Sequence, residues 1–233
     1  MRIITWNSGK GLFRKKAKYI GVMNPDVLVT QEITRHDEKL EFDGNFQPTF
    51  RDWVSLDRPG GDIGVYSFTN TQLAPVASDD PIPGFHLYTA QRGDLSFQVV
   101  AVWSFFTRAK ETRNTQIHDG LRRYGEWIAQ KPTVIMGDFN DNGSFNNDRW
   151  RNLLDLMEPL GMASAYHRYF GEAFGEETRP TYQFHWSEEA VFHVNYVFMP
   201  EDWAQRITKV QVGDSHHWNN LSDHMPVIVD LDL

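Results

Sequence analysis

The chain has 233 residues, of which 40% are hydrophobic and none is cysteine. This length and hydrophobic content favour a single α/β domain over residues 1–233. The lack of cysteine excludes disulfide frameworks, thiolate catalysis and cysteine-based zinc sites. A net charge of −8 argues against a basic protein that coats nucleic acid, but it does not exclude a nuclease, because acidic metal sites add negative charge.

The N-terminal residues Met1–Trp6 are typical of a strand that starts at once, with neither the basic region nor the long apolar stretch of a signal peptide. No apolar run approaches the length that spans a bilayer. We therefore expect a cytoplasmic protein without a membrane span. We also expect a monomer, since the chain is large enough to build its own core.

Short apolar segments along the chain predict strands. They are Ile3–Trp6, Val27–Gln31, Ile63–Phe68, Phe97–Ser104, Thr133–Met136, Val191–Met199, Ile207–Val212 and Met225–Leu231. Two segments rich in Gly, Glu and Pro, Asn45–Arg58 and Gly171–Pro180, are expected to be loops.

Helices are predicted between several of these strands. Apolar residues recur at helical spacing after Thr115, and Pro132 closes this helix. A second helix is predicted over Asp148–Leu160, with Gly161 as its stop signal, and a short one follows Gly11. No Gly-x-Gly-x-x-Gly motif follows the first strand, which argues against a dinucleotide-binding fold. The pattern favours mixed sheets packed face to face, with helices outside.

Polar residues stand at the ends of four predicted strands, where a rigid scaffold can present them together. Asp223 and His224 are adjacent, so they can serve one site only from the turn that enters the last strand, which Pro226 ends. Mg²⁺ suits such a site because it takes one or two carboxylates and keeps several waters. The polar residues are Asn7, Glu32, Asp138, Asn140, Asp223 and His224.

Each of these features also has a purely structural explanation. Asn7 fits a turn, Glu32 fits a helix-capping role, and the Asp-His pair fits a solvated strand start. The run Gly137–Gly143 resembles a calcium loop, but Arg149 occupies the twelfth position, where such a loop needs Glu. Taken together, the polar strand ends favour a functional site.

Four motifs follow one another along the chain: Trp6-Asn7, Gln31-Glu32, Gly137-Asp138-Phe139-Asn140 and Ser222-Asp223-His224-Met225-Pro226-Val227. In this order they resemble the motifs of the endonuclease/exonuclease/phosphatase superfamily, which has the deoxyribonuclease-I-like fold. The resemblance spans Met1–Leu233, and the chain is most similar to small bacterial members of this superfamily. It implies a four-layer α/β/β/α sandwich made of two mixed β-sheets.

The resemblance implies a Mg²⁺-dependent phosphodiesterase or phosphomonoesterase, for which Mn²⁺ can substitute. Its metal ligands would be Glu32 and Asp223, with Asn7 nearby. The catalytic residues that it implies act on water and on the phosphate: Asp138 orients or deprotonates the attacking water, Asn140 bonds the phosphoryl oxygens, and His224 contacts the scissile phosphate.

The sequence departs from the family pattern at Asn195, where an Asp is common. That Asp would bond the imidazole of His224 and favour its charged form, whereas an Asn amide orients the ring without a counter-charge. By analogy with acid-to-amide changes in His-Asp pairs, the cost is about two to four orders of magnitude in rate.

Three further residues are candidates for substrate binding. Tyr182 lies in a weaker family match, Pro180-Thr181-Tyr182. Trp103 stands where many members have His or Tyr, although a core aromatic is the favoured interpretation. His118 begins a predicted helix, where a surface histidine is the favoured interpretation.

Three functions remain open from the sequence. The leading hypothesis is a nuclease acting on DNA, of the type of a repair endonuclease or exonuclease. Aromatic residues in predicted loops, such as Trp53 and Trp186, would then stack on bases. The acidic balance favours instead a phosphatase or diesterase for a small phosphorylated metabolite or lipid headgroup. The third, a catalytically impaired phosphate-binding protein, is motivated by Asn195.

Overall fold

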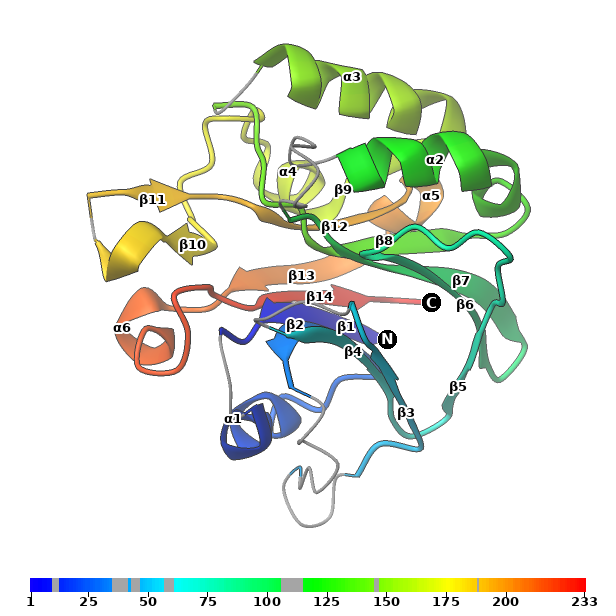
Figure 1. Ribbon diagram of the computed structural model, residues 1–233, viewed down its shortest axis with the longest axis horizontal. Helices are drawn as coiled ribbons and strands as arrows, with labels where there is room; N and C mark the ends of the chain where they lie inside the picture. Colours follow the sequence, from blue (N-terminus) through cyan, green and yellow to red (C-terminus); the bar gives the residue numbers. More distant parts are fainter. Residues whose placement is uncertain are drawn as a thin grey trace.

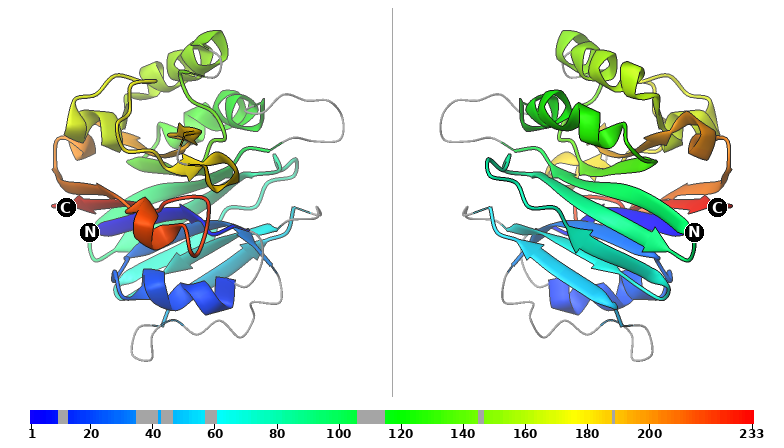
Figure 2. Two further views of the ribbon diagram at one scale, coloured as in Figure 1. Left: turned by 90° about the vertical axis from the view of Figure 1, so that its left-hand side faces the viewer. Right: turned by 90° about the vertical axis from the view of Figure 1, so that its right-hand side faces the viewer.

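The computed structural model describes residues 1–9, 13–34, 42, 47–56, 61–105, 115–144, 147–187 and 189–233. Two six-stranded sheets pack face to face, and helices cover the outer face of each (Figures 1 and 2). The predicted four-layer α/β/β/α sandwich is therefore confirmed.

Both sheets are mixed. In the first sheet β1 and β2 run parallel and the other neighbours antiparallel; its order is β13 (Ile207–Val212), β14 (Val227–Leu231), β1 (Arg2–Asn7), β2 (Val27–Ile33), β4 (Asp62–Ser67) and β3 (Phe50–Val54). In the second sheet β7 and β8 are the parallel pair; its order is β5 (Thr71–Pro75), β6 (Phe85–Arg92), β7 (Leu95–Trp103), β8 (Thr133–Asp138), β12 (Asn195–Pro200) and β9 (Met162–Ser164).

The remaining elements lie outside these sheets. A small hairpin pairs β10 (Tyr182–Gln183) with β11 (Val191–Phe192). The helices are α1 (Phe13–Gly21), α2 (Thr115–Ile128), α3 (Asn147–Met157), α4 (Ala165–Phe170), α5 (Glu201–Ala204) and α6 (Ser215–Trp218), with 3-10 turns at Glu158–Leu160 and Phe184–Trp186.

Each sheet is buried on both faces. Along β7, Val99 and Ala101 join the core between the sheets, whereas Val100 and Val102 pack toward α2 and α3. Neighbouring strand residues point to opposite faces, so such strands read as continuous apolar runs. A third core cluster lies between the first sheet and α1. The helices are thus fixed by the outward-facing half of each strand.

Several predicted boundaries were wrong. The segment Asn45–Arg58 was expected to be a loop, but it contains β3, whose residues are all half-buried. The predicted strand Val191–Met199 is two strands, β11 and β12, interrupted at His193 and Val194. The edge strand β5 was missed because it is short, ends in Pro75 and is mostly exposed.

The predicted helices agree more closely with the structure than the predicted strands do. Helix α2 follows the predicted segment, and α1 begins soon after Gly11. The helix predicted over Asp148–Leu160 ends its α-helical part at Met157 and continues as a 3-10 turn. Gly161 then caps this turn with φ 62°, as its role as a stop signal requires. No helix in the described parts of the chain is long and apolar enough to cross a membrane.

Candidate active site

The polar strand ends meet at one end of the sandwich, the end at which Figure 1 shows the β10–β11 hairpin and α6. Strands β1 and β2 are parallel, so Asn7 pairs in register with Gln31, and Glu32 follows directly. In the other sheet, Asp138 ends β8 opposite Asn195, the first residue of antiparallel β12. Both sheets therefore contribute side chains to the same end.

The buried side chain of Asn7 joins the two sheets. Its Nδ2 donates to Oε1 of Glu32 at 3.2 Å and to Oδ2 of Asp138 at 2.9 Å. Its Oδ1 accepts from the backbone N–H of Gly9 at 3.0 Å, which fixes the orientation of the amide. Asn7 therefore brings two carboxylates from different sheets onto one nitrogen atom.

Glu32 owes its position to an irregularity in β2. The pairing with β4 shifts between Thr30 and Ile33, and Glu32 has φ 60°, in the left-handed region. A bulge of this kind re-aims a side chain out of the strand's alternation. Gly61 makes room for it, because a Cβ there would lie 2.7 Å from the Glu32 Cα. Glu32, a predicted functional residue, therefore adopts a strained backbone conformation.

The Gly-Asp-x-Asn motif has a physical basis at each end. A Cβ on Gly137 would lie 1.8 Å from the carbonyl oxygen of Val102, so only glycine fits beside β7. Asn140 adopts φ 50°, which Asn tolerates better than most residues. Its Nδ2 donates to Asp138 Oδ2 at 2.9 Å and to the Ser104 carbonyl oxygen at 2.8 Å. Asp138 is therefore held by amide donors from both Asn7 and Asn140.

Asp223 and His224 lie on the turn that precedes β14, as their adjacency required. The Ser222 hydroxyl donates to the Asn7 carbonyl oxygen at 2.8 Å and accepts from the His224 backbone N–H at 3.1 Å. The Trp6 indole donates to the His224 carbonyl oxygen at 2.9 Å. These bonds attach the turn to the end of β1.

Asn195 meets His224 across the gap between the sheets. The Asn195 Oδ1 lies 2.9 Å from Nδ1 of His224. Burial lowers the pKa of His224 to about 3, so the imidazole is neutral near pH 7. An amide oxygen only accepts, so Nδ1 carries the proton and Nε2 presents its lone pair. The buried Nδ2 of Asn195 has no hydrogen-bond partner, a position where a carboxylate would place a second acceptor.

The three candidate substrate-binding residues separate in the structure. The Tyr182 ring stacks on His224, with centroids 4.4 Å apart. Trp103 is buried at the end of β7, opposite Asp138 in register and against Phe105. His118 is buried rather than on the surface, and its Nε2 lies 3.3 Å from the carbonyl oxygen of Arg149 between α2 and α3. Tyr182 alone of the three contacts the imidazole.

Thr181 is a site residue that the sequence analysis did not single out. Its buried hydroxyl accepts from the backbone N–H groups of Val194 and Asn195 at 2.8 and 2.9 Å. Its carbonyl oxygen accepts from the Met225 N–H at 2.8 Å. Thr181 thus links Asn195 to the turn that carries His224. Its place beside Tyr182, in a segment that matched the family weakly, was the available signal.

The donor set fits a divalent cation. Among the described residues, no three acidic or histidine side chains are grouped closely enough to enclose a metal ion by themselves. Mg²⁺ needs only one or two carboxylates, with waters and substrate oxygens completing its shell. The carboxylates of Glu32 and of Asp223, on the nearby turn, offer oxygen ligands of the kind that Mg²⁺ and Mn²⁺ prefer, whereas the Asn7 amide turns its nitrogen toward Glu32 and its oxygen toward the Gly9 N–H.

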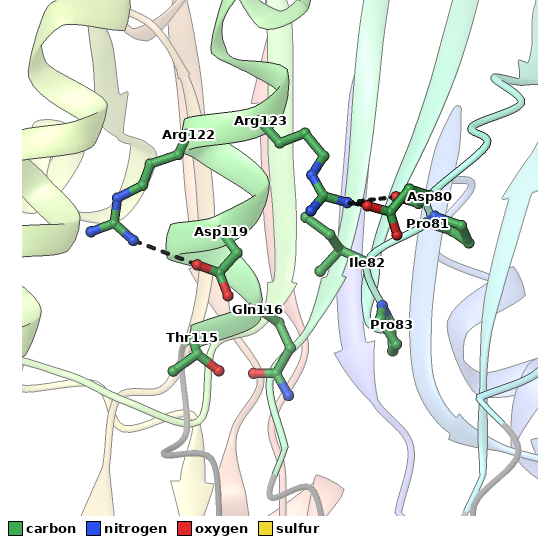
Figure 3. Close-up of a pocket in the computed structure, with 9 residues that line it drawn as sticks. All are labelled: Asp80, Pro81, Ile82, Pro83, Thr115, Gln116, Asp119, Arg122 and Arg123. Atoms are coloured by element: carbon green, nitrogen blue, oxygen red, sulfur yellow. Dashed lines mark hydrogen bonds and ion pairs between the residues drawn. The ribbon is translucent and has the colours of Figure 1, made fainter. Parts of the chain in front are cut away.

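A pocket of about 530 Å³ beside α2 is a separate feature (Figure 3). None of the predicted site residues lines it. Its arginines already face acidic partners, since Arg123 lies 2.6 Å from Asp80 and Arg122 lies 3.5 Å from Asp119. The convergent strand ends, rather than this pocket, therefore define the candidate active site.

No family model and no curated protein sequence matches the chain. Solved structures do match over its whole length. A 3′ phosphatase from Neisseria, bound to product DNA hairpin, superposes with a TM-score of 0.67 and 14% identity, covering 100% of both chains. The AP endonuclease LMAP from Leishmania major gives 0.74 and 14%, covering 100% of this chain and 87% of its own.

A third match is an endonuclease/exonuclease/phosphatase family protein from Leptotrichia buccalis, with a TM-score of 0.66 and 16% identity, covering 100% of both chains. At these identities the likeness concerns the fold. The resemblance inferred from the four sequence motifs is thereby confirmed: this chain has the fold of the endonuclease/exonuclease/phosphatase structures.

Proposed function

We propose that the chain is a metal-dependent phosphoric ester hydrolase, acting foremost as a nuclease on DNA phosphodiester bonds. The observation that carries this proposal is the Asn7 amide, which gathers Glu32 and Asp138 opposite the His224–Asn195 pair. Carboxylates, amides and one imidazole on rigid strand ends are the groups that phosphoryl transfer to water requires.

Each chain residue has a distinct role in this proposal. Asp138 is held by two amide donors and accepts a proton from, or orients, the attacking water. Asn140 would bind phosphoryl oxygens from one side and His224 from the other once its Nε2 is protonated, because the lone pair on Nε2 of the neutral ring cannot donate a hydrogen bond. Asn195 fixes the ring of His224 through a hydrogen bond at Nδ1, so the phosphate would be bound through the other ring nitrogen, Nε2. The reacting phosphate would thus sit between the two sheets' contributions.

A cation is needed on electrostatic grounds. Glu32 and Asp138 share one amide donor, and Asp223 follows Ser222, which is bonded to Asn7. Such a group of carboxylates repels a phosphodiester. Glu32 and Asp223, with Asn7 nearby, would hold Mg²⁺ or Mn²⁺, which supplies Lewis-acid stabilisation of charge on the phosphoryl oxygens.

DNA is the preferred substrate class for two reasons. The superposed structures include an AP endonuclease and a phosphatase bound to a DNA hairpin. In the protein, the β10–β11 hairpin next to His224 also carries two exposed aromatic residues, Phe184 and Trp186, whose exposed fractions are 46% and 59%. Exposed aromatic side chains are groups on which nucleic-acid bases stack. Trp53, the other suggested stacking residue, lies half-buried in β3 against Tyr66 and is set aside.

Two alternatives keep a specific motivation. The net charge of −8 favours a small phosphoester over an extended duplex. Asn195, with its unpartnered buried amide nitrogen, motivates a catalytically impaired phosphate-binding protein.

A substrate panel tests all three functions. Wild type and Asn195→Asp are assayed with Mg²⁺, Mn²⁺ or EDTA on plasmid, abasic-site DNA, single-stranded DNA and small phosphoesters. Cation-dependent DNA cleavage supports the nuclease. Turnover of small phosphoesters alone supports the first alternative. If neither protein turns over any substrate, the enzymatic proposal is wrong.

A further inference from the structure

A second group of hydrogen-bonded polar side chains lies away from the candidate active site. A pocket of about 480 Å³ opens between α3, β9 and α4. Its walls include the apolar side chains of Leu154, Phe174 and Phe198, together with Ser164 and His167, and four charged residues also line it: Asp155, Glu158, Arg168 and Glu201. A small apolar ligand with one polar group suits such a lining.

Ser164, His167 and Glu177 form a continuous hydrogen-bonded line at this pocket. The Ser164 Oγ lies 2.8 Å from Nδ1 of His167, and Nε2 of the same ring lies 3.1 Å from Oε1 of Glu177. A nucleophile within hydrogen-bond reach of a base that a third group orients is the general arrangement for nucleophilic catalysis. The ring nitrogens are reversed here relative to a Ser-His-Asp triad, in which the serine faces Nε2 and the carboxylate faces Nδ1. His167 is held further by Phe174, whose ring centroid lies 3.7 Å away.

The direction of these hydrogen bonds follows from Glu177. Burial opposes its ionisation, but hydrogen bonds from His167 and from backbone N–H groups outweigh burial and hold its pKa below the usual value. An ionised carboxylate only accepts, so Nε2 of His167 donates to it. In the neutral imidazole Nδ1 then accepts, which makes the Ser164 hydroxyl the donor. The serine proton is therefore already directed at a base.

Helix capping does not account for Ser164. A serine before a helix usually accepts a backbone N–H of the first turn through its hydroxyl oxygen. Ser164 precedes α4 but makes no such bond, and its hydroxyl meets the His167 ring instead. The serine and the histidine both line the pocket, whereas Glu177 is buried behind them.

We propose that Ser164 is an activated nucleophile that hydrolyses small apolar carboxylic esters in this pocket. Its Oγ attacks the ester carbonyl as its proton passes to Nδ1 of His167. The bond to the alcohol oxygen breaks, and the alcohol leaves with that proton. Water then attacks the acyl-serine as one of its protons passes to His167, the bond between the acyl carbon and the Ser164 Oγ breaks, and His167 returns the proton to that Oγ as the acid leaves. Arg168 lines the same pocket and is paired with Glu201, 3.4 Å away.

A fluorophosphonate with a short alkyl chain tests the nucleophile, because it forms a stable bond only with activated serines. Intact protein is incubated with the probe, and labelling is followed by mass spectrometry with peptide mapping. We expect one adduct, on Ser164, and hydrolysis of p-nitrophenyl acetate that the adduct abolishes. His167→Gln should slow labelling by about 10²-fold or more, as loss of a general base does.

Three controls complete the test. His216→Gln, in an exposed helix, should label at the wild-type rate. Asp138→Asn should also label normally, since the proposal does not depend on phosphoryl transfer. Ser164→Ala should lose the adduct while keeping the far-ultraviolet circular dichroism of the fold. The proposal is overturned if folded wild type is not labelled, if the adduct maps elsewhere, or if His167→Gln labels at an unchanged rate.

Discussion

The Asn195 Oδ1 lies 2.9 Å from the His224 Nδ1, so an uncharged amide occupies the position from which a carboxylate would stabilise a charged imidazole. The two residues come from different sheets, Asn195 from the start of β12 and His224 from the turn before β14. The pair orients the ring but offers it no counter-charge. Several predictions about activity depend on this arrangement and its surroundings.

Replacing Asn195 with Asp should raise the rate of phosphoester hydrolysis by about 10²- to 10⁴-fold. The new carboxylate accepts the Nδ1–H bond and favours the imidazolium form of His224, which burial now opposes. The measurement is kcat/KM on the best substrate of the panel, compared at several pH values. An unchanged rate in a correctly folded Asn195→Asp variant would show that this pair does not limit catalysis.

Glu32→Gln should lower cation-dependent activity by about 10²-fold or more and weaken Mg²⁺ or Mn²⁺ binding, because it removes a charged oxygen ligand. Calorimetric titration with Mn²⁺ measures binding apart from turnover. Glu126→Gln, on the exposed face of α2, is the matched control and should behave as wild type. Full activity of Glu32→Gln would contradict the metal assignment.

Thr181→Val should lower activity and stability together. It preserves the shape of the side chain but leaves the buried N–H groups of Val194 and Asn195 without their acceptor, at a cost of about 1–3 kcal/mol each. Thr181→Ser retains the hydroxyl and should recover most of the loss. Denaturant unfolding gives the stability, and the NMR signal of the His224 Nδ1 proton reports whether the ring stays in place.

Trp186→Ala should raise KM for DNA by about tenfold, since stacking of one base contributes about 1–3 kcal/mol. Turnover of a small phosphoester should not change, because the tip of the hairpin lies outside the residues that hold the phosphate. Tyr169→Ala removes another exposed aromatic, on α4, and is the control. Equal effects of Trp186→Ala on both substrates would argue against base stacking.

Acid should destabilise the fold between about pH 6.5 and pH 4 through buried histidines. Burial lowers the pKa of His193 to about 4, so the unfolded chain takes up a proton over this range while the folded chain does not. Stability is therefore present above pH 6.5 and falls, by up to about 3 kcal/mol for this residue, as the pH falls toward 4. His193→Asn keeps a donor for the Arg179 carbonyl oxygen and should flatten the pH dependence of the unfolding free energy. His216→Gln should leave the wild-type slope.

The sequence predicted the sandwich because inner strands of both sheets, such as β2, β7 and β8, are buried on two faces and form largely apolar runs. Strand β13 was predicted with its observed ends, Ile207–Val212. Strand β6 was missed because polar and charged residues alternate along its exposed side, as in the run from Thr89 to Arg92. Local composition there reflects the solvent exposure of alternate residues of β6 rather than the absence of a strand.

The candidate site was predicted in its residues but not in its connections. Motifs identified Asn7, Glu32 and Asp138 separately, whereas the hydrogen bonds of Asn7 to both carboxylates depend on the approach of two sheets. The left-handed backbone of Glu32 likewise depends on the bulge against β4 and on Gly61. Such features arise from pairing between distant segments, which no local pattern in the chain encodes.

Because Asn7 donates hydrogen bonds to carboxylates from both sheets, the geometry of the site depends on the relative position of the two sheets. A shift of about 1 Å between catalytic groups can cost about 10²-fold in rate. A packing defect deep between the layers, for example at the buried Val99, would therefore reach the chemistry through alignment alone. Turnover would then decline although the protein still unfolded in a single cooperative transition. The packing between the two sheets therefore sets the distances between the side chains of the candidate site.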